Sequence, residues 1–518
     1  MNSEKNSKYV TEKNSKYVKY RMEKFIFLSI FLLGVFLRLY NLGRDSLWLD
    51  EYVSFQIARE PSLIEVYSSA LLDNHPPLHY LLLHIITYFG ESEFILRLPS
   101  AVFGILTIPV AYKLGEYYFG KNEGLISAFL LSISYFHIRY SQEARMYAQL
   151  LFFSALSLYF FSRAIKENQN KFWIAFIFAS TLGVYSHYFA LLLIPSYISF
   201  FGIMKLKVDN SNTLRFQSRK FLLSLIGIAI LSLPLASGFY ITILHKTAPG
   251  TIWGVRPSLE FIPMIFGSLS GGYLNLPFFI VFFAFGFISI WNKDRKKAIF
   301  LSTWIFIPIL LSIGIAYLIF FQLRYLIFLL IAYLIVVSKG ITSIFSKVIL
   351  SENRAIKGMR KKRVESIKTR KIANIHFTKL LVILLIIAIL IAANFSSLAN
   401  YYLYPNRDDW KGVASYLNEH TQEGDVIISL LLSHNLPFQY YYNAQGRELI
   451  IPVNYTISEL KSLTSMNKTT WYLIHKDTII VDPNLEISNW ISANAEPGFL
   501  SPYIRIYVHR VPKAELSS

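Results

Sequence analysis

Acidic and basic side chains stand at the ends of long apolar runs in this sequence. The stretch "SLWLDEYVSF" at residues 46–55 places two carboxylates, Asp50 and Glu51, side by side just after the first apolar run. A carboxylate can take a proton from a hydroxyl group, and the planar fork of an arginine can grip two oxygens of an anion. Charged or titratable groups of both kinds recur at the ends of apolar runs, at His75, Arg97, Glu143, Arg145 and Arg324.

The elements that must position these side chains are membrane helices. Of the 518 residues, 54% are hydrophobic, and they form long blocks without the amphipathic periodicity of a soluble core. The formal charge of +19 is concentrated in the N-terminal tail and in short segments between the blocks. This distribution is typical of topology signals, so we expect no nucleic-acid partner. Because the chain has no cysteine, disulfides, thiolate zinc sites and cysteine nucleophiles are excluded.

The apolar blocks predict a polytopic α-helical membrane protein. After the first run, apolar stretches lie near residues 95–118, 123–138, 144–164, 172–188, 189–204, 221–243, 277–291, 298–319, 323–338 and 378–399. We therefore expect a basic cytosolic tail at residues 1–24 and a transmembrane domain at 25–399, in which residues 43–95 form the first outer loop.

The segment "HPPLHYLLLHIITYFG" at residues 75–90 decides the predicted topology. If it lies along the interface, the tail, the loop from Lys205 to Lys220 and the basic stretch from Lys339 to Lys371 all face the cytosol. If it spans the membrane, the last two fall outside. Because basic loops favour the cytosol, the pattern predicts an interfacial segment and about 11 spans. We therefore expect an integral protein of the plasma membrane whose N-terminus lies in the cytosol.

This topology places the charged residues named above on one outer face. Charged groups at helix ends deep in a membrane protein cost several kcal/mol unless they are paired or face water, so their convergence indicates a polar cavity. Plainer interpretations remain open: Asp50 and Glu51 as solvated loop charges, His75 as a turn residue before two prolines, and Arg97 and Arg145 as anchors that reach for the interface.

The last part of the chain, residues 400–518, has a different pattern. The stretch "DWKGVASYLNEHTQEGDVIISLLL" predicts an amphipathic helix, a turn and an apolar strand, and "TTWYLIH" and "YIRIYVHRV" predict further strands. We expect a small extracytoplasmic α/β domain. It could cover or bind an acceptor, or be a structural cap.

Six motifs carry a family resemblance. In order along the chain they are "SLWLDEYVS", "HPPLHYLLLH", "LRLPSAVFGILTIPVAY", "RYSQEARMYA", "YSHYFALLLIP" and "LRYLIFLL". Together they resemble the glycosyltransferase family 39 branch of the GT-C superfamily, which includes dolichyl-phosphate-mannose protein mannosyltransferases and is related to the lipid A aminoarabinose transferases. The resemblance covers residues 25 to 340 and implies a multi-spanning enzyme that uses a polyprenyl-phosphate-linked sugar on the extracytoplasmic side.

The resemblance assigns roles to particular residues. Asp50 matches the acidic position that the family uses as catalytic base, and Glu51 would orient the acceptor or tune the charge of Asp50. Arg97, in "LRLPSAVFG", aligns with a membrane-adjacent arginine of the mannosyltransferases and is the leading phosphate ligand. His75 stands where the aminoarabinose transferases carry a lysine before proline, so it is a second candidate for the donor phosphate.

The remaining candidates lie at three other helix ends. Arg145 and Arg324 are further candidates for the phosphate, and Glu143, Tyr325 and His187 are candidates for binding the sugar or the acceptor. Glu143 and Arg145 could instead form a structural ion pair with each other.

A divalent metal is one alternative for stabilising the leaving phosphate. Asp50, Glu51 and Glu143 could form an oxygen-rich site of the kind that oligosaccharyltransferases of the wider superfamily use. The arginines can stabilise the phosphate without a metal, so we predict neither a metal nor another cofactor. The predicted partners are the polyprenyl-phosphate-linked sugar, a protein, lipid-linked glycan or lipid acceptor, and the surrounding membrane lipids.

Two other classes of protein are compatible with many spans. A transporter or flippase predicts charges near the membrane midplane, broken helices and related halves, whereas this sequence gathers its charges at one face and has no evident internal repeat. A binding or sensor protein would depend on the C-terminal domain and would tolerate loss of Asp50.

Overall fold

The computed structural model describes residues 2–207, 212–247, 257–319, 321–359, 388, 392, 394–430, 436–442, 448–452, 456–464, 468–476, 478 and 482–510. Its internal contacts divide the chain into two compact units, and each is described by itself. The helical unit comprises Met1–Tyr40, Glu60–Tyr88 and Arg97–Asn400. The sheet unit comprises Asn41–Arg59, Phe89–Leu96 and Tyr401–Ser518.

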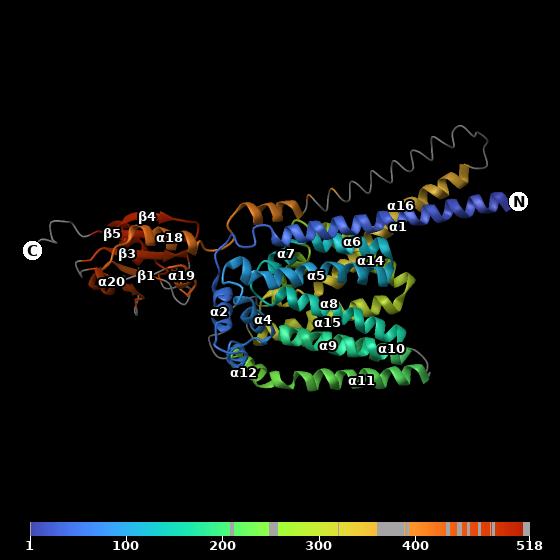
Figure 1. Ribbon diagram of the computed structural model, residues 1–518, viewed down its shortest axis with the longest axis horizontal. Coiled ribbons are helices and arrows are strands. Elements are labelled where there is room, and N and C mark those ends of the chain that lie inside the picture. Colours follow the sequence, from blue (N-terminus) through green and yellow to red (C-terminus); the bar gives the residue numbers. More distant parts are fainter. Residues whose placement is uncertain are drawn as a thin grey trace, which may run out of the picture. The chain divides into compact units, whose positions relative to one another are not determined.

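The helical unit is a bundle whose long helices run alongside one another (Figure 1). Its helices up to α9 are α1 Asn2–Leu39, α3 Leu63–Leu72, α4 Leu78–Thr87, α5 Glu93–Phe119, α6 Lys121–Ser132, α7 Tyr135–Ser141, α8 Tyr147–Glu167 and α9 Asn170–Ser186. The others are η1 Tyr188–Leu192, α10 Leu193–Lys207, α11 Asn212–Ser232, η2 Leu233–Leu235, α12 Ala236–Thr247, α13 Phe261–Leu269, α14 Leu276–Lys293, α15 Arg295–Leu318, η3 Leu323–Leu326 and α16 Leu329–Met359.

Membrane-spanning segments are present, as the apolar blocks predict. Within the described residues, six segments are long and apolar enough to cross a bilayer: Glu93–Phe119, Tyr147–Glu167, Gln217–His245, Leu276–Lys293, Arg295–Leu318 and Leu329–Ser346. The predicted polytopic helical fold is confirmed. The count of about 11 spans stays a prediction, because most of the stretch 378–399, and residues 360–371 of the basic stretch, lie outside the described residues.

Two apolar stretches are broken where the sequence suggested continuous runs. The stretch 123–138 is divided between α6 and α7, and the hydroxyl of Ser134 accepts a bond from the amide of His137 to start α7. The stretch 221–243 contains the 3₁₀ turn η2, which holds Pro234. Proline lacks an amide hydrogen, so the regular helical bonding is interrupted at that turn.

Helix α4 bears on the predicted topology. It has ten residues, about 15 Å at the rise of an α-helix, whereas a bilayer core is about 30 Å thick. The segment 75–90 is therefore too short in its helical part to span, in agreement with the interfacial placement that the charge pattern predicts.

Two glycines bring helices α14 and α16 into direct backbone contact. A Cβ atom added to Gly286 would lie 2.1 Å from the carbonyl oxygen of Val336, and one added to Gly340 would lie 1.7 Å from that of Phe282. Such separations are far inside van der Waals contact, so neither position accepts a side chain without moving a helix. Small residues at helix crossings are the usual way in which membrane helices approach closely.

A buried ion pair joins α6 to α16 near that crossing. The ammonium group of Lys339 lies 2.7 Å from Oε1 of Glu123, and the hydroxyl of Thr342 donates to the same oxygen at 2.8 Å. Glu123 is 6% exposed, so its charge depends on these partners.

The sheet unit contains the predicted α/β domain. Its elements are α2 Leu49–Ala58, α18 Trp410–His420, β1 Val426–Ser429, α19 Leu436–Tyr441, β2 Glu448–Ile450, α20 Ile457–Thr464, β3 Thr470–His475, α21 Glu486–Asn494, β4 Glu496–Leu500 and β5 Ile504–His509. The strand order is β2-β1-β3-β5-β4, with β1 parallel to β2 and β3 and with β5 antiparallel to its neighbours.

Both faces of this sheet are covered. Trp410 and Leu417 of α18 pack with Ile427 and Leu473 on one face, and Ile491 of α21 belongs to a second buried cluster on the other. Alternate residues of β1 and β3 join opposite clusters, as the two-residue period of a strand requires. The domain is thus a layered α/β structure with an apolar core on each side of its sheet.

Candidate active site

The turn between α3 and α4, together with the start of α4, carries three polar groups at one end of the helical unit: Asp73, His75 and Tyr80. Helix α3 ends at Leu72 with Asp73 as its C-cap, and Asn74 adopts a left-handed conformation with φ 66°, which asparagine tolerates better than most residues. Pro76 and Pro77 then delay the next helix until Leu78. This short turn holds the side chains of Asp73 and His75 on the same side as Tyr80.

Four side chains meet in a hydrogen-bonded cluster, which we call the polar cluster: Asp73, His75, Tyr80 and Arg145. The hydroxyl of Tyr80 donates to Oδ2 of Asp73 at 2.9 Å, and Nδ1 of His75 lies 3.3 Å from the same oxygen. Arg145 approaches from the segment before α8, and its Nη2 lies 3.2 Å from Nε2 of His75. Its Nη1 donates to the hydroxyl of Tyr80 at 3.5 Å.

These contacts define the protonation of His75. A guanidinium group only donates, so Nε2 must accept the bond from Arg145. On the other side of the ring, Nδ1 lies 2.9 Å from the backbone carbonyl oxygen of Asp73, which only accepts. The geometry therefore assigns the neutral imidazole with its proton on Nδ1. In this state the positive charge of the polar cluster belongs to Arg145.

The environment keeps Asp73 ionised. Burial by itself raises the pKa of the Asp73 carboxyl group. The hydrogen bond and the electrostatic attraction of His75, the positive charge of Arg145 and the hydrogen bond from Tyr80 together hold that pKa below its ordinary value of 3.8. Asp73 therefore carries a negative charge at neutral pH and balances the guanidinium. The polar cluster is a compensated acid–base network.

Aromatic rings surround the cluster and include three more of the predicted residues. The ring of His187 lies 6.0 Å from that of His75 and 4.9 Å from that of Tyr325. The guanidinium of Arg324 stands 5.3 Å over the ring of Tyr147, a cation–π geometry. The structure thus brings together five residues that the sequence proposed separately: His75, Arg145, His187, Arg324 and Tyr325.

An apolar cavity of about 310 Å³ adjoins these residues. His75 and His187 line one part of it, and its remaining walls are mainly apolar side chains of η1, α12 and α15 such as Leu192, Ile243 and Leu318. The cavity and the polar cluster share His75. The arrangement suits an amphiphile that has a charged group beside a long apolar chain.

Two other predicted residues are buried in the helical unit. Arg97 in α5 is 2% exposed, which argues against a side chain that reaches out to the interface. Glu143 is 3% exposed, and its Oε1 lies 3.7 Å from Nε of Arg139. The side chain of Arg145 points to His75 and Tyr80, and its backbone carbonyl accepts a bond from Ser100 of α5 at 2.9 Å.

Asp50 and Glu51 lie in the sheet unit, in the first turn of α2. Glu51 is fully buried and forms an ion pair with Arg407, and its Oε2 also accepts a bond from the backbone amide of Trp48 at 3.4 Å. Asp50 is half-buried, and its carbonyl oxygen accepts a bond from the hydroxyl of Ser54. The two adjacent carboxylates therefore have different environments: Glu51 is fixed by a cation, and Asp50 lies closer to solvent.

Four residues of these sites were missed by sequence reasoning: Asp73, Tyr80, Tyr147 and Arg407. Asp73 stands two positions before the motif histidine, and Tyr80 belongs to the motif "HPPLHY" itself, so both had a local signal. Arg407 had none, because its partner Glu51 is 356 positions away.

A metal site is a separate question. Among the residues that the structure describes, no group of three or more carboxylate or imidazole side chains is placed to hold a metal ion.

Comparison with known proteins places this geometry in a class. The family described as dolichyl-phosphate-mannose-protein mannosyltransferase matches residues 74–236, a range that includes His75, Arg145 and His187. An uncharacterized protein of Aquifex aeolicus (strain VF5) is 29% identical over 193 residues, which cover 35% of this chain and 38% of that relative. The match thus spans less than two thirds of the relative's length.

Solved structures share the whole fold. ArnT from Cupriavidus metallidurans in the apo state superimposes with a TM-score of 0.57 and 13% identity, covering 93% of this chain and 97% of that chain. The same protein bound to undecaprenyl phosphate gives a TM-score of 0.57 at 12% identity, again over 93% and 97%. The archaeal oligosaccharyltransferase AglB from Archaeoglobus fulgidus, in complex with an inhibitory peptide and a dolichol-phosphate, gives 0.56 at 11% identity, covering 91% and 71%.

These findings place the chain among membrane-spanning helical proteins that share the fold of ArnT and AglB, and they match residues 74–236 to the mannosyltransferase family. The chain therefore resembles the protein mannosyltransferases in sequence over residues 74–236, and ArnT and the oligosaccharyltransferase AglB in fold.

Proposed function

We propose that this protein transfers a sugar from a dolichyl or undecaprenyl phosphate to a hydroxyl group of a protein, glycan or lipid on the extracytoplasmic face of the plasma membrane. The observation that carries the proposal is the contact between the polar cluster and the apolar cavity, which share His75. A polyprenyl-phosphate sugar has a phosphate directly attached to an isoprenoid chain. It is an amphiphile of the kind that this arrangement suits.

The phosphate would bind at the guanidinium of Arg145, beside His75. An arginine fork holds two phosphate oxygens. The imidazole of His75 can change from hydrogen-bond acceptor to donor at Nε2 when it takes up a proton as the phosphate approaches. The first isoprene units would occupy the apolar cavity, with the rest of the chain continuing into the bilayer. Arg97 and Arg324 remain further candidates for the phosphate, and Glu143, His187 and Tyr325 for the sugar or the acceptor.

The chemical step needs a base and a stabilised leaving group. In the proposal, Asp50 takes the proton of the acceptor hydroxyl, and the acceptor oxygen attacks the anomeric carbon of the sugar. The bond from that carbon to the phosphate oxygen breaks, and the electron pair leaves with the polyprenyl phosphate. The phosphate gains one negative charge, which Arg145 and Arg97 stabilise.

The ion pair of Glu51 with Arg407 supports Asp50 as the base. A buried carboxylate fixed by a guanidinium is poorly suited to accept a proton, because protonation would leave Arg407 uncompensated. Asp50 is more exposed than Glu51 and so is more accessible to an acceptor. Glu51 would instead hold the first turn of α2, and so orient Asp50.

The test is a transfer assay with the purified protein in lipid nanodiscs and a labelled polyprenyl-phosphate hexose. Asp50→Asn should lower the transfer rate about 100- to 10,000-fold, the contribution of a general base, while donor binding persists. Glu91→Gln, at an exposed carboxylate in the same unit, should have little effect. Near-normal turnover of Asp50→Asn would refute its role as the base.

A second readout tests the enzyme itself. The protein would be a lipid flippase if it moved labelled polyprenyl phosphate across the bilayer of proteoliposomes but transferred no sugar to a protein, glycan or lipid acceptor. That result would refute the proposal.

A further inference from the structure

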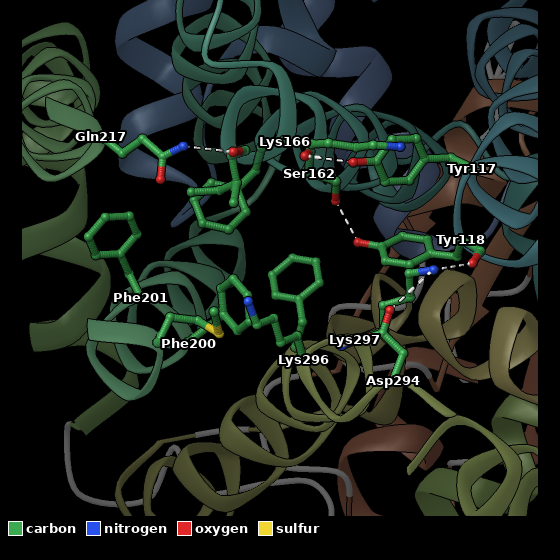
Figure 2. A pocket seen from close by; sticks show the side chains of 14 residues that line it. Tyr117, Tyr118, Ser162, Lys166, Phe200, Phe201, Gln217, Asp294, Lys296 and Lys297 are labelled. Atoms are coloured by element: carbon green, nitrogen blue, oxygen red, sulfur yellow. Dashed lines mark hydrogen bonds and ion pairs between the residues drawn. The ribbon is translucent and has the colours of Figure 1, made fainter. Parts of the chain in front are cut away.

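A second cavity lies at the other end of helix α8, away from the polar cluster. Its volume is about 450 Å³, and it is lined by the end of α5, the end of α8, α10, α11 and the start of α15 (Figure 2). Helix α8 has 21 residues, about 30 Å of helix, and Arg145 precedes its first residue whereas Ser162 and Lys166 are near its last. This cavity is therefore separate from the proposed donor site.

Aromatic rings form one wall of this cavity. The rings of Phe200 and Phe300 are 4.6 Å apart, and that of Phe161 is 5.5 Å from Phe300. The hydroxyl groups at the cavity are already engaged: that of Ser162 donates to a helix carbonyl, and it lies 2.5 Å from the hydroxyl of Tyr118. The wall thus offers apolar contact and few hydrogen bonds to a ligand.

Three lysines supply the charge. Lys297 donates to the carbonyl oxygen of Tyr118 at 2.8 Å and lies 3.5 Å from Asp294, so it offsets the acidic residue at the cavity. Lys166 stands 5.2 Å over the ring of Tyr117, and neither it nor Lys296 forms an ion pair with any residue that the structure describes. Figure 2 shows these two lysines on different sides of the cavity. The net charge that faces a ligand is positive.

We infer that this cavity binds an anionic membrane phospholipid, with the phosphate of its headgroup between Lys166 and Lys296 and one acyl chain along the Phe161, Phe200 and Phe300 wall. The start of α15 adds the positive end of a helix dipole to the same site. The cavity lies where apolar spans end in basic residues, which is the depth of lipid headgroups. A soluble anion would use the lysines and leave the aromatic wall without a partner.

The predicted topology agrees with this occupant. The positive-inside pattern assigns this end of the bundle to the cytosol, and anionic lipids are enriched in the cytoplasmic leaflet. The lipid would join the ends of α5, α8, α10 and α15 and stabilise that end of the bundle. The inference does not depend on the sugar that the enzyme transfers.

The experiment uses the full chain, purified in a neutral detergent and titrated separately with phosphatidylglycerol, phosphatidylcholine and inorganic phosphate. Native mass spectrometry gives the affinity of the bound lipid, and the melting temperature gives its effect on stability. We expect saturable binding and a higher melting temperature with phosphatidylglycerol, and neither effect with phosphatidylcholine or phosphate. An equal rise of the melting temperature with inorganic phosphate would overturn the inference and indicate a site for a free anion.

Two kinds of variant test the site itself. Lys166→Gln combined with Lys296→Gln should weaken phosphatidylglycerol binding about 25-fold, or about fivefold per lysine, the usual effect of one basic side chain near an anionic surface. Met204→Trp, which fills the cavity and keeps its charge, should weaken binding severalfold as well. The matched control is Lys171→Gln with Lys293→Gln, two exposed lysines that do not line the cavity.

Each outcome decides the inference. Wild-type affinity in the Lys166→Gln/Lys296→Gln protein would overturn it, as would an equal loss in the control protein, which would reduce the binding to unspecific attraction. If the double variant melts lower even without lipid, Met204→Trp decides, because it keeps both lysines.

Discussion

The two ends of helix α8 carry polar groups of different design. At the Tyr147 end, Arg145, His75, Asp73 and Tyr80 form a network in which opposite charges are balanced over short distances. At the Lys166 end, three lysines and one aspartate lie around an aromatic cavity, so positive charge is in excess. A balanced network fixes each group in place and suits chemistry on a small anion, whereas unbalanced charge attracts a ligand without positioning it closely. In our proposals, the bundle thus keeps the site of sugar transfer at one end of α8 and the lipid-binding site at the other.

Removal of Arg145 should have the largest effect of the variants that test this difference between the two ends of α8. Arg145→Ala deletes the only positive charge that we assign to the polar cluster at neutral pH, so donor affinity and transfer should both fall, with transfer lower by about 100- to 1,000-fold. Arg145→Lys should restore part of the loss, because it returns the charge but not the fork. The measurements are donor binding and single-turnover transfer.

The control for Arg145 is Lys171→Gln at the other end of the bundle, which should leave both measurements unchanged. A well-folded Arg145→Ala protein with normal donor affinity would remove the polar cluster from the donor site. The same assay applied to Arg97→Ala shows whether this buried arginine shares the phosphate or is needed only for folding.

The ion pair of Glu123 with Lys339 tests whether the basic end of the bundle has a structural role only. Glu123→Gln leaves Lys339 without its buried carboxylate and should lower the free energy of unfolding by about 3 kcal/mol, with unchanged donor affinity. Thermal unfolding in detergent measures the loss. Glu116→Gln is the matched control, since its pair with Lys113 is exposed and should contribute less than about 1 kcal/mol. A donor affinity reduced as far as in Arg145→Ala would mean that the two ends are not independent.

The smallest expected effect is the pH dependence of Asp73. Its pKa is lower in the folded protein, so the ionised carboxylate stabilises the fold at pH above its ordinary 3.8, and this contribution disappears as the pH falls through the lower folded-state value. Asp73→Asn should therefore reduce stability by about 1 to 2 kcal/mol near neutral pH. Once the pH has fallen below the folded-state pKa of Asp73, the difference from the wild type should vanish. Melting curves across that range test it, and a constant difference at every pH would contradict the assignment.

The helical part of the fold could be predicted well from the sequence, because long apolar blocks leave few alternatives to spanning helices. The stretch 95–118 corresponds to α5, Glu93–Phe119, and 298–319 to α15, Arg295–Leu318. In the sheet unit, β1, β3 and β5 were predicted from apolar runs. Strands β2 and β4 were missed because β2 has three residues and β4 includes both Pro497 and Gly498.

The candidate site was predicted as a set of residue types but not as a network. His75 and Arg145 were identified from chemistry and resemblance, yet their contact joins positions 70 apart and has no local signature. Asp73 was missed because a carboxylate at the end of a helix is usually a solvated cap. The ion pair between Glu51 and Arg407, which distinguishes the two adjacent carboxylates, was also not predicted. Its partners are 356 positions apart, so their pairing depends on the completed fold.

The turn between α3 and α4 has a consequence for how the protein is made. Asp73, His75 and Tyr80 come from one short segment, and Arg145 follows Tyr80 by 65 positions. At a synthesis rate of about 5 to 20 residues per second, the ribosome releases the arginine several seconds after the turn. The bonds of Asp73 to His75 and Tyr80 join nearby positions, so we expect this part of the network to form before Arg145 arrives. The order of synthesis thus offers the guanidinium a ready anionic partner, which favours docking of the segment before α8 at the correct end of the bundle.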